Sequence, residues 1–392
     1  MIRDRIRVLE LRSVRGTGGG PEKTILLGAQ HADTDRFAVT VCYIRDGRDQ
    51  LFGIDARAGH LGIDYVEILE RSSFDRRIWP ALRRLVRERS IDIVHAHEYK
   101  TDLLALLLAR AEGTIPLATL HGWTGHSWRE RWLYYALDKR LLRAFPMTIA
   151  VSSQIRAELL NHHVPADRVR VILNGIDPQS FRRDRARESV VRQELGIAPG
   201  EIVVGSIGRL EPQKRFDLLI RACAALRGRW PGLRLLIAGD GSQRGELEAL
   251  ADRLLPAGAC RWLGHQPDIT RLHHGFDLFV QSSDYEGTSN AVLEAMALET
   301  PLVATAAGGT EEMIEHDREG LVVPCGDLNQ LAAAIERALL EPVQTHERVA
   351  RARRRIETTL SFGARVAALE RIYSELAAQR VRPLGRISEQ CA

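Results

Sequence analysis

The chain alternates short apolar runs with helical segments along its whole length, and this alternation constrains its fold more than any other feature. In the first half, strand-like runs occupy residues 6–11, 37–44, 92–97, 117–122 and 147–153. Helical patterns lie between them, as at 75–89, 101–111 and 128–143. Strands that alternate with helices at this spacing predict a parallel sheet covered by helices on both faces.

The second half repeats the pattern. Its strand-like runs are 201–210, 233–241, 276–284, 301–309 and 320–327, and a helix is expected over 216–228. Between the halves, residues 174–200 hold Pro178 and a charged run, RRDRARE, which we interpret as a linker.

The length of 392 residues suits two domains of ordinary size. We therefore expect an α/β protein with two Rossmann-like, doubly wound domains that face a central cleft at the carboxyl ends of their strands. The expected boundaries are 1–178 and 179–360. A C-terminal helix, 361–380, is expected to pack back on the first domain.

Composition excludes several classes of protein. Hydrophobic residues make up 45% of the chain, too many for a disordered protein, and no apolar run is long enough to span a bilayer. The charged start, MIRDRIRVLELRS, leads us to expect no export and a cytoplasmic location. Five scattered cysteines without a CxxC pair argue against a disulfide framework and a zinc site.

The charge is distributed unevenly. The net charge of +4 is too weak to indicate a nucleic-acid partner. Up to residue 180 the chain has 27 Lys and Arg against 22 Asp and Glu, and the remainder has 28 against 29. The basic excess therefore lies in the first half.

The strongest local signal is the segment 282–314, in which a loop leads from a strand into a helix. Three residues at the expected helix start are good caps: Thr288, Ser289 and Asn290. The free backbone N–H groups of a first helical turn form an anion site that suits a phosphate.

Two carboxylates flank this helix start. Glu294 lies about one turn into the helix, where it could accept hydrogen bonds from the two adjacent hydroxyls of a ribose. Glu286 lies in the preceding loop beside Gly287. On this segment alone, Glu294 could equally be a partner of the helix dipole, and Glu286 a solvated loop acid.

Two cations follow the strand at 201–210. Gly208 allows a ligand to approach the backbone, Arg209 comes next, and Lys214 lies at the start of the following helix. Facing a phosphate-binding helix start, these cations could neutralise a diphosphate. Each could also be an ordinary solvated side chain.

Several of these segments, taken in order, resemble the retaining nucleotide-sugar glycosyltransferases of glycosyltransferase family 4, which have the GT-B fold. They are NGID at 174–177, GRL at 208–210 with Lys214, Glu286 with Glu294, and GGTEE at 308–312, with a glycine cluster at 16–20. The likeness spans nearly the whole chain. It implies transfer of a hexosyl group from a UDP- or GDP-sugar to an acceptor hydroxyl, with no cofactor, and the scarcity of acidic metal motifs predicts that the transfer is metal-independent.

The resemblance also implies roles for residues of the second domain. Arg209 and Lys214 would bind the donor diphosphate, Glu294 the ribose hydroxyls and Glu286 the donor sugar. Backbone N–H groups of residues 287–290 would meet the sugar and the phosphate.

In the first domain, Gly19 and Gly20 would close over the diphosphate, and His121, at a strand's end, would lie near the donor sugar. The segment at Leu263–His265 would meet the nucleobase, although the sequence after His265 departs from the family pattern.

His95 and His97 end another strand and share one face of it. Only one need reach the cleft, and we favour His97, with Glu98, on the acceptor side; ordinary structural roles are the alternative. A zinc site of His95, His97 and His121 lacks an acid or thiol set with metal spacing, so no metal is predicted.

The DxD-like pair Asp33 and Asp35 is interpreted as a solvated turn. Loss of activity in EDTA would contradict metal independence.

The acceptor is expected to be a lipid-linked or growing glycan in cell-surface polysaccharide biosynthesis. Basic segments at 75–89 and 127–145, the second with Trp128, Trp132 and Tyr135, could dock on anionic lipid at the inner membrane face. They could equally be ordinary surface helices.

Other interpretations remain. Within the GT-B group, an epimerase or a non-catalytic assembly component would also bind a nucleotide sugar. Residues 18–24 superficially resemble a P-loop, but Glu22 would place a carboxylate against the phosphates. No GxGxxG follows the first strand, which disfavours a dehydrogenase.

Overall fold

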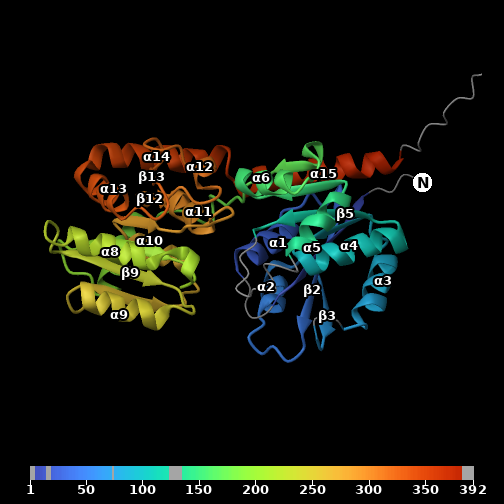
Figure 1. The fold of residues 1–392 in the computed structure, drawn as a ribbon, viewed down its shortest axis with the longest axis horizontal. Helices are drawn as coiled ribbons and strands as arrows, with labels where there is room; N and C mark the ends of the chain where they lie inside the picture. The colour runs from blue at the N-terminus through green and yellow to red at the C-terminus, as the bar shows by residue number, and fades with distance from the viewer. Residues whose placement is uncertain (1–4, 15–18, 73–74, 123–134, 382–392) are drawn as a thin grey trace, which may run out of the picture. The chain divides into compact units, whose positions relative to one another are not determined.

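The computed structural model describes residues 5–14, 19–72, 75–122 and 135–381. The chain divides into two compact units (Figure 1). Unit 1 comprises Met1–Val151, Ile155–Ile172 and Arg365–Ala392, and unit 2 comprises Ser152–Gln154 and Leu173–Ala364. These divisions fall close to the expected boundaries at 178 and 360.

Unit 1 is built on a parallel sheet in the order β3-β2-β1-β4-β5-β6-β7. Its strands are β1 (Ile6–Ser13), β2 (Phe37–Asp46), β3 (Asp64–Glu70), β4 (Ile93–Ala96), β5 (Ile115–Leu120), β6 (Met147–Ala150) and β7 (Val169–Val171). Its helices are α1 (Gly20–Gln30), α2 (Ile54–Leu61), α3 (Ile78–Glu88), α4 (Tyr99–Glu112), α5 (Tyr135–Leu141), most of α6 (Ser153–Asn161) and most of α15 (Phe362–Val381), with short turns η2 (Leu142–Ala144) and η3 (Ala166–Arg168).

Helices cover both faces of the unit 1 sheet. Alternate residues of β1 point to opposite faces, so Leu9 and Leu11 pack with α3, α4 and α6, whereas Val8 packs with α15. The C-terminal helix α15, red in Figure 1, contributes Ile372 and Tyr373 to that second layer. Helix α15 therefore completes the core of the first unit.

Unit 2 has a parallel sheet in the order β10-β9-β8-β11-β12-β13. Its strands are β8 (Ile202–Ile207), β9 (Leu233–Ala238), β10 (Cys260–Gly264), β11 (Leu278–Gln281), β12 (Leu302–Thr305) and β13 (Leu321–Val323). Its helices are α7 (Glu188–Glu194), α8 (Phe216–Leu226), α9 (Arg244–Leu254), α10 (Ile269–Gly275), α11 (Asn290–Ala297), α12 (Thr310–Met313), α13 (Leu328–Leu340) and α14 (Pro342–Thr358), with turns η4 (Arg185–Arg187) and η5 (Pro212–Lys214).

The central strands of unit 2 are buried on both faces, which explains their nearly continuous apolar sequences. In β11, Leu278 and Val280 pack with α8, α9 and α13, whereas Phe279 packs with α7, α10, α11 and α14. The predicted doubly wound α/β architecture is thus confirmed for both units.

Each sheet has one point at which its strand order reverses. This switch point lies between β1 and β4 in unit 1, and between β8 and β11 in unit 2. Open α/β sheets bind ligands in the crevice that forms beyond the carboxyl ends of the strands at such a point.

Candidate functional site

The predicted cations lie at the switch point of unit 2. Gly208 and Arg209 directly follow β8, and Lys214 ends the short turn η5. Arg209 is exposed and forms no ion pair with the part of the chain that the structure describes. Lys214 is largely buried and reaches the loop that follows β11, the neighbouring strand.

Glu286 is the residue that Lys214 contacts. Lys214 Nζ lies 2.5 Å from Glu286 Oε1. The same oxygen accepts hydrogen bonds from Gln281 Nε2 at 3.0 Å and from Ser283 Oγ at 2.7 Å. Within the described residues no hydrogen bond reaches Oε2, the second oxygen of this carboxylate. The site therefore fixes the carboxylate firmly and leaves one oxygen for a ligand.

The loop at Glu286 and Gly287 rests on the turn that begins the GGTEE segment. Gly308 has φ of +58°, and a Cβ there would lie 1.8 Å from the carbonyl oxygen of Glu286. Gly309 N–H donates to the carbonyl of Gly287 at 2.8 Å. Glycine at 308 is therefore required both by the left-handed backbone and by this close approach.

The start of α11 is tied to the NGID segment. The backbone N–H of Asn174 donates to Thr288 Oγ1 at 3.2 Å, and its side-chain amide donates to the Thr288 carbonyl at 3.3 Å and to Asn290 Oδ1 at 3.4 Å. Gly175 adjoins Ser361, whose carbonyl oxygen would lie 2.7 Å from a Cβ there. The side chains of Thr288 and Asn290 thus position the helix start, so the groups that it could offer to the predicted anion are its backbone N–H groups.

Two more predicted donor-binding residues lie nearby in the fold. Ser289 is the cap residue of α11, although its side chain makes no capping hydrogen bond. Glu294 is buried one turn further along the same helix. By contrast, His265 is exposed and follows β10, the edge strand two positions away from β8.

In unit 1, the predicted glycines lie at the switch point. Gly20 begins α1, with Pro21 in the first turn. The Gly19 N–H donates to the carboxylate of Glu22, which is buried and forms a 2.5 Å ion pair with Arg12 Nε. Arg12 also donates to the backbone carbonyl of His97 at 3.0 Å. Glu22 therefore links the start of α1 to the end of β4.

Three histidines of unit 1, His95, His97 and His121, lie in one hydrogen-bonded network with Glu10, a residue that the sequence did not single out. His97 Nε2 lies 2.5 Å from Glu10 Oε2, and His97 Nδ1 lies 3.2 Å from Nε2 of His121. His95 Nδ1 contacts Glu10 at 3.2 Å and Tyr373 at 2.8 Å. As predicted, His95 and His97 share one face, but both are buried, and only His121 is partly exposed.

Burial sets the protonation of these groups. Burial lowers the pKa of His97 to about 4, and lowers that of His121 well below its ordinary value. Burial acts to raise the pKa of Glu10, but its interactions with His95 and His97 hold it well below its usual range. At neutral pH the carboxylate is therefore ionised and His97 and His121 are neutral.

Glu98 adjoins this network at the start of α4. Burial raises the pKa of its carboxyl to about 7, against the opposing charges of Arg12 and Lys100. Its Oε1 atom is buried and has no hydrogen-bond partner among the described residues.

Comparison with known proteins agrees with this geometry. Residues 188–356 match the family model for glycosyl transferases group 1, and residues 18–180 match the model for Glycosyltransferase Family 4. EpsD of Bacillus subtilis, which carries a provisional glycosyltransferase name, is 30% identical over 287 residues, or 70% of this chain and 75% of that protein. The chain belongs to glycosyltransferase family 4.

Two further proteins resemble this glycosyltransferase over most of its length. The glycogen synthase of Mycobacterium tuberculosis is 29% identical over 353 residues, which cover 86% of this chain and 79% of that protein. A crystal structure of HepE from Anabaena in complex with UDP and glucose matches with a TM-score of 0.83 and 22% identity, covering 94% of this chain and all of that one. That likeness establishes the GT-B fold. Membership of family 4 rules out the P-loop NTPase and dehydrogenase interpretations.

Among the residues that the structure describes, one group of side chains has a composition that could hold a metal ion: Glu10, His95 and His97, whose ligand atoms lie within 4.8 Å of one another. Their mutual distances of 2.5 and 3.2 Å are those of hydrogen bonds. We therefore interpret the group as a hydrogen-bonded network. The DxD-like pair forms a turn, as predicted, because Asp35 N–H donates to Asp33 Oδ1 at 3.0 Å.

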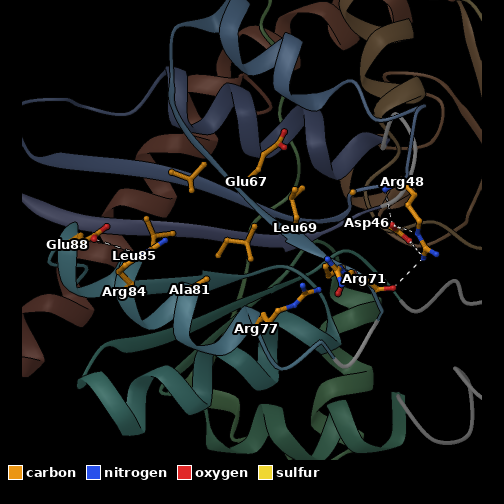
Figure 2. Close-up of a pocket in the computed structure, with 14 residues that line it drawn as sticks. Asp46, Arg48, Glu67, Leu69, Arg71, Arg77, Ala81, Arg84, Leu85 and Glu88 are labelled. Carbon is orange, nitrogen blue, oxygen red and sulfur yellow. Dashed lines mark hydrogen bonds and ion pairs between the residues drawn. The ribbon is translucent and has the colours of Figure 1, made fainter.

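A hollow of about 670 Å³ lies beside the edge strand β3 and helix α3 of unit 1 (Figure 2). Part of its charged lining is paired within the hollow, with Arg48 bonded to Asp46 at 2.7 Å and Arg84 lying 3.9 Å from Glu88. It borders β2 and β3 rather than β1 and β4. We assign it no part in sugar transfer.

The aromatic residues Trp128 and Trp132, for which lipid docking and an ordinary surface helix were left as alternatives, lie outside the described residues. The other basic segment is described. On α3, Arg83 and Arg87 both pair with Glu112 of α4. Part of the basic charge of α3 is therefore neutralised within the protein.

Proposed function

We propose that this glycosyltransferase moves a hexosyl group from a UDP- or GDP-sugar to a hydroxyl of a growing or lipid-linked glycan, with retention of the anomeric configuration, in cell-surface polysaccharide biosynthesis. The observation that carries the proposal is the Lys214–Glu286 pair at the β8/β11 switch point. A cation for a phosphate and a carboxylate for a sugar hydroxyl meet there beside a helix start.

In the proposed donor complex, Lys214 and the exposed Arg209 bind the diphosphate, and the N–H groups of residues 287–290 add a partial positive charge. The free oxygen of Glu286 accepts a hydrogen bond from a sugar hydroxyl. Glu294 holds the ribose hydroxyls, and the backbone near His265 meets the base.

Charge stabilisation supplies the catalysis in this scheme. The bond between the anomeric carbon and the β-phosphate oxygen breaks, and its electron pair leaves with the diphosphate. Lys214 and Arg209 stabilise that growing negative charge and so lower the barrier. The acceptor oxygen forms the new bond on the same face and gives its proton to a phosphate oxygen. No side chain is assigned as a covalent nucleophile, and no step requires a metal ion.

We assign supporting roles to unit 1. Gly20 begins α1, and its N–H is suited to a phosphate oxygen, whereas the Gly19 N–H is already bonded to Glu22. His121 meets the donor sugar, and Glu98 serves the acceptor side. The predicted acceptor contact of His97 does not fit its burial, because its two ring nitrogens are bonded to Glu10 and His121. A glycan acceptor accords with the name of the mycobacterial relative, a glycogen synthase.

Membrane contact remains a separate part of the proposal. No helix in the described part of the chain is long and apolar enough to cross a bilayer. Docking of unit 1 on anionic lipid predicts sedimentation with anionic vesicles at low salt, and a protein that stays in the supernatant would remove this part.

The donor proposal is tested by a thermal-shift screen against UDP, GDP, ADP and their sugars, because a ligand that binds only the native state raises the melting temperature. We expect stabilisation by UDP or GDP and by at least one of their sugars. Proton NMR of the product then reports the anomeric configuration, and an inverted product would contradict retention. Conversion of the donor sugar without acceptor would indicate an epimerase instead.

Metal independence is tested separately. We expect transfer to continue at an unchanged rate after dialysis against EDTA. Loss of activity that an added divalent cation restores would contradict it.

A further inference from the structure

Three polar side chains lie in line across the neighbouring strands β1, β4 and β5. Glu10 lies on β1, His97 directly follows β4, and His121 directly follows β5. Glu10 Oε2 is 2.5 Å from His97 Nε2, and His97 Nδ1 is 3.2 Å from His121 Nε2. The line therefore runs from the buried carboxylate of Glu10 to the ring of His121, the one member of the three that is partly exposed.

The protonation state of each group in this line determines which nitrogen of the next group carries a proton. An ionised carboxylate can only accept hydrogen bonds, so His97 Nε2 must carry the proton that it shares with Glu10. A neutral imidazole has one N–H and one acceptor nitrogen, so Nδ1 of His97 must accept. The donor to that nitrogen is His121 Nε2. The remaining nitrogen of His121, Nδ1, is then unprotonated.

The surroundings of Glu10 keep it ionised. Its Oε1 atom accepts the Tyr373 hydroxyl at 2.6 Å and lies 3.2 Å from His95 Nδ1. Burial raises the pKa of the Tyr373 hydroxyl well above its ordinary value, so it remains a donor. Burial lowers the pKa of Arg365 only to about 10, so its guanidinium stays charged near the carboxylate.

We propose that Glu10, acting through His97, fixes His121 in the Nε2–H tautomer, so that the enzyme presents an unprotonated imidazole nitrogen as a hydrogen-bond acceptor for a substrate hydroxyl. Glu10 and His97 are positioning residues in this scheme. A neutral acceptor selects an O–H group over a phosphate or carboxylate, which offers no donor. That the hydroxyl belongs to a sugar rests on the proposed function, whereas the tautomer itself does not.

The state of His121 Nδ1 is consistent with this role. None of the described residues hydrogen-bonds to it, while the other ring nitrogen is occupied by His97. Gly122, which follows, has φ of +107°. This left-handed backbone conformation suits glycine.

Replacement of Glu10 by glutamine should reverse the direction of the hydrogen bonds along this line. On the Oε1 side, the site offers the donors of Tyr373 and His95, so the amide oxygen of Glu10→Gln is expected to face them. Its NH₂ group then points at His97 Nε2 and donates. His97 must move its proton to Nδ1, and His121 must become the Nδ1–H tautomer.

The test is ¹⁵N NMR of the full chain with labelled histidine at neutral pH, with signals assigned from His97→Asn and His121→Asn. In the wild-type protein we expect an unprotonated Nδ1 and a protonated Nε2 at His121. In Glu10→Gln we expect the opposite. Thr119→Val is the matched control, because Thr119 contacts His95 at 2.7 Å but lies outside the line, so it should leave the tautomer of His121 unchanged.

A protonated Nδ1 at His121 in the wild-type protein would overturn the inference without recourse to any variant. So would an unchanged tautomer in a folded Glu10→Gln protein, or a stoichiometric metal ion that occupies His97 Nε2. In the transfer assay, Glu10→Gln should raise the donor KM about five- to tenfold, the scale of one hydrogen bond to a neutral group. Absence of transfer in the wild-type protein would contradict the proposed function, while the tautomer measurement would still decide this inference.

Discussion

Lys214 and Glu286, 72 residues apart in sequence, form an ion pair in unit 2, with Nζ 2.5 Å from Oε1. Gln281 and Ser283 hold the same carboxylate oxygen. Because these two contacts do not depend on the lysine, Glu286 can keep its position when Lys214 turns to a phosphate. The pair would therefore give the proposed donor site a cation that can respond to the ligand and a carboxylate that is already in place.

Substitution of the lysine tests its role in stabilising the leaving group. Lys214→Ala should lower the turnover number by two or more orders of magnitude, on the scale of one lost electrostatic stabiliser. The measurement is initial-rate kinetics with the donor found by the thermal-shift screen. Arg221→Ala, which removes an exposed cation from α8 of the same unit, should have little effect. Full turnover by a folded Lys214→Ala protein would refute the assignment.

Glu294 should act on donor affinity rather than on the chemical step. Glu294→Ala removes the proposed acceptor for the ribose hydroxyls, and we expect donor binding to weaken by about tenfold or more. Calorimetric titration measures this, and turnover at saturating donor should change less. The exposed Glu246 of α9 supplies the control, Glu246→Ala. Unchanged affinity in Glu294→Ala would exclude the ribose contact.

Gly308 is predicted to be irreplaceable for steric reasons. Gly308→Ala would place a Cβ 1.8 Å from the Glu286 carbonyl oxygen in a residue with φ of +58°. We expect the melting temperature to fall by roughly 5–10 °C, as for other changes that strain the backbone. Gly245→Ala is the matched control, because nothing lies within 4 Å of its Cβ position on helix α9. Equal melting temperatures for the two variants would contradict the steric argument.

The raised pKa of Glu98 predicts a specific pH dependence of stability. Burial raises its pKa to about 7, with Glu70 adding to the shift and Arg12 and Lys100 opposing it. Between its ordinary value of 4.5 and about 7, the folded protein binds a proton that the unfolded chain has lost, so stability falls as pH rises through this window.

Glu98→Gln remains neutral and should be the more stable protein above pH 7, by roughly 3 kcal/mol if Glu98 acts alone. Below about pH 4.5 the difference should disappear, because Glu98 is protonated in both states. Thermal melts across this pH range measure the effect, with Glu246→Gln as the exposed control. A difference that does not vary with pH would point to packing instead of ionisation.

Much of the fold could be predicted from sequence because central parallel strands have continuous apolar runs. Three strands were not predicted: β3, β7 and β10, all of which are edge strands. In β3 most residues are partly or fully exposed, and the sequence DYVEILE mixes acidic and apolar side chains. An edge strand is paired on one side only, so it lacks the apolar signal that identified the others.

Some residues of the candidate site could be predicted from sequence and others could not, because only residues in local motifs leave a recognisable pattern. Lys214, Glu286 and Glu294 lie in local motifs that resemble a known family, and the structure brings Lys214 and Glu286 together. Glu10 could not be found this way, because its partners lie 85 to 363 residues away and a buried acid looks the same in sequence as an exposed one. The only available signal was an acid inside the first apolar run.

The central claim is that the β8/β11 switch point binds a nucleoside diphosphate through Lys214. Calorimetric titration of UDP and of GDP into the wild-type protein and into Lys214→Ala tests it most directly. We predict that the wild-type protein binds one of the two, and that Lys214→Ala binds the same nucleotide at least tenfold more weakly. Equal affinity in the two proteins, or no binding of either nucleotide by the wild type, would contradict the account.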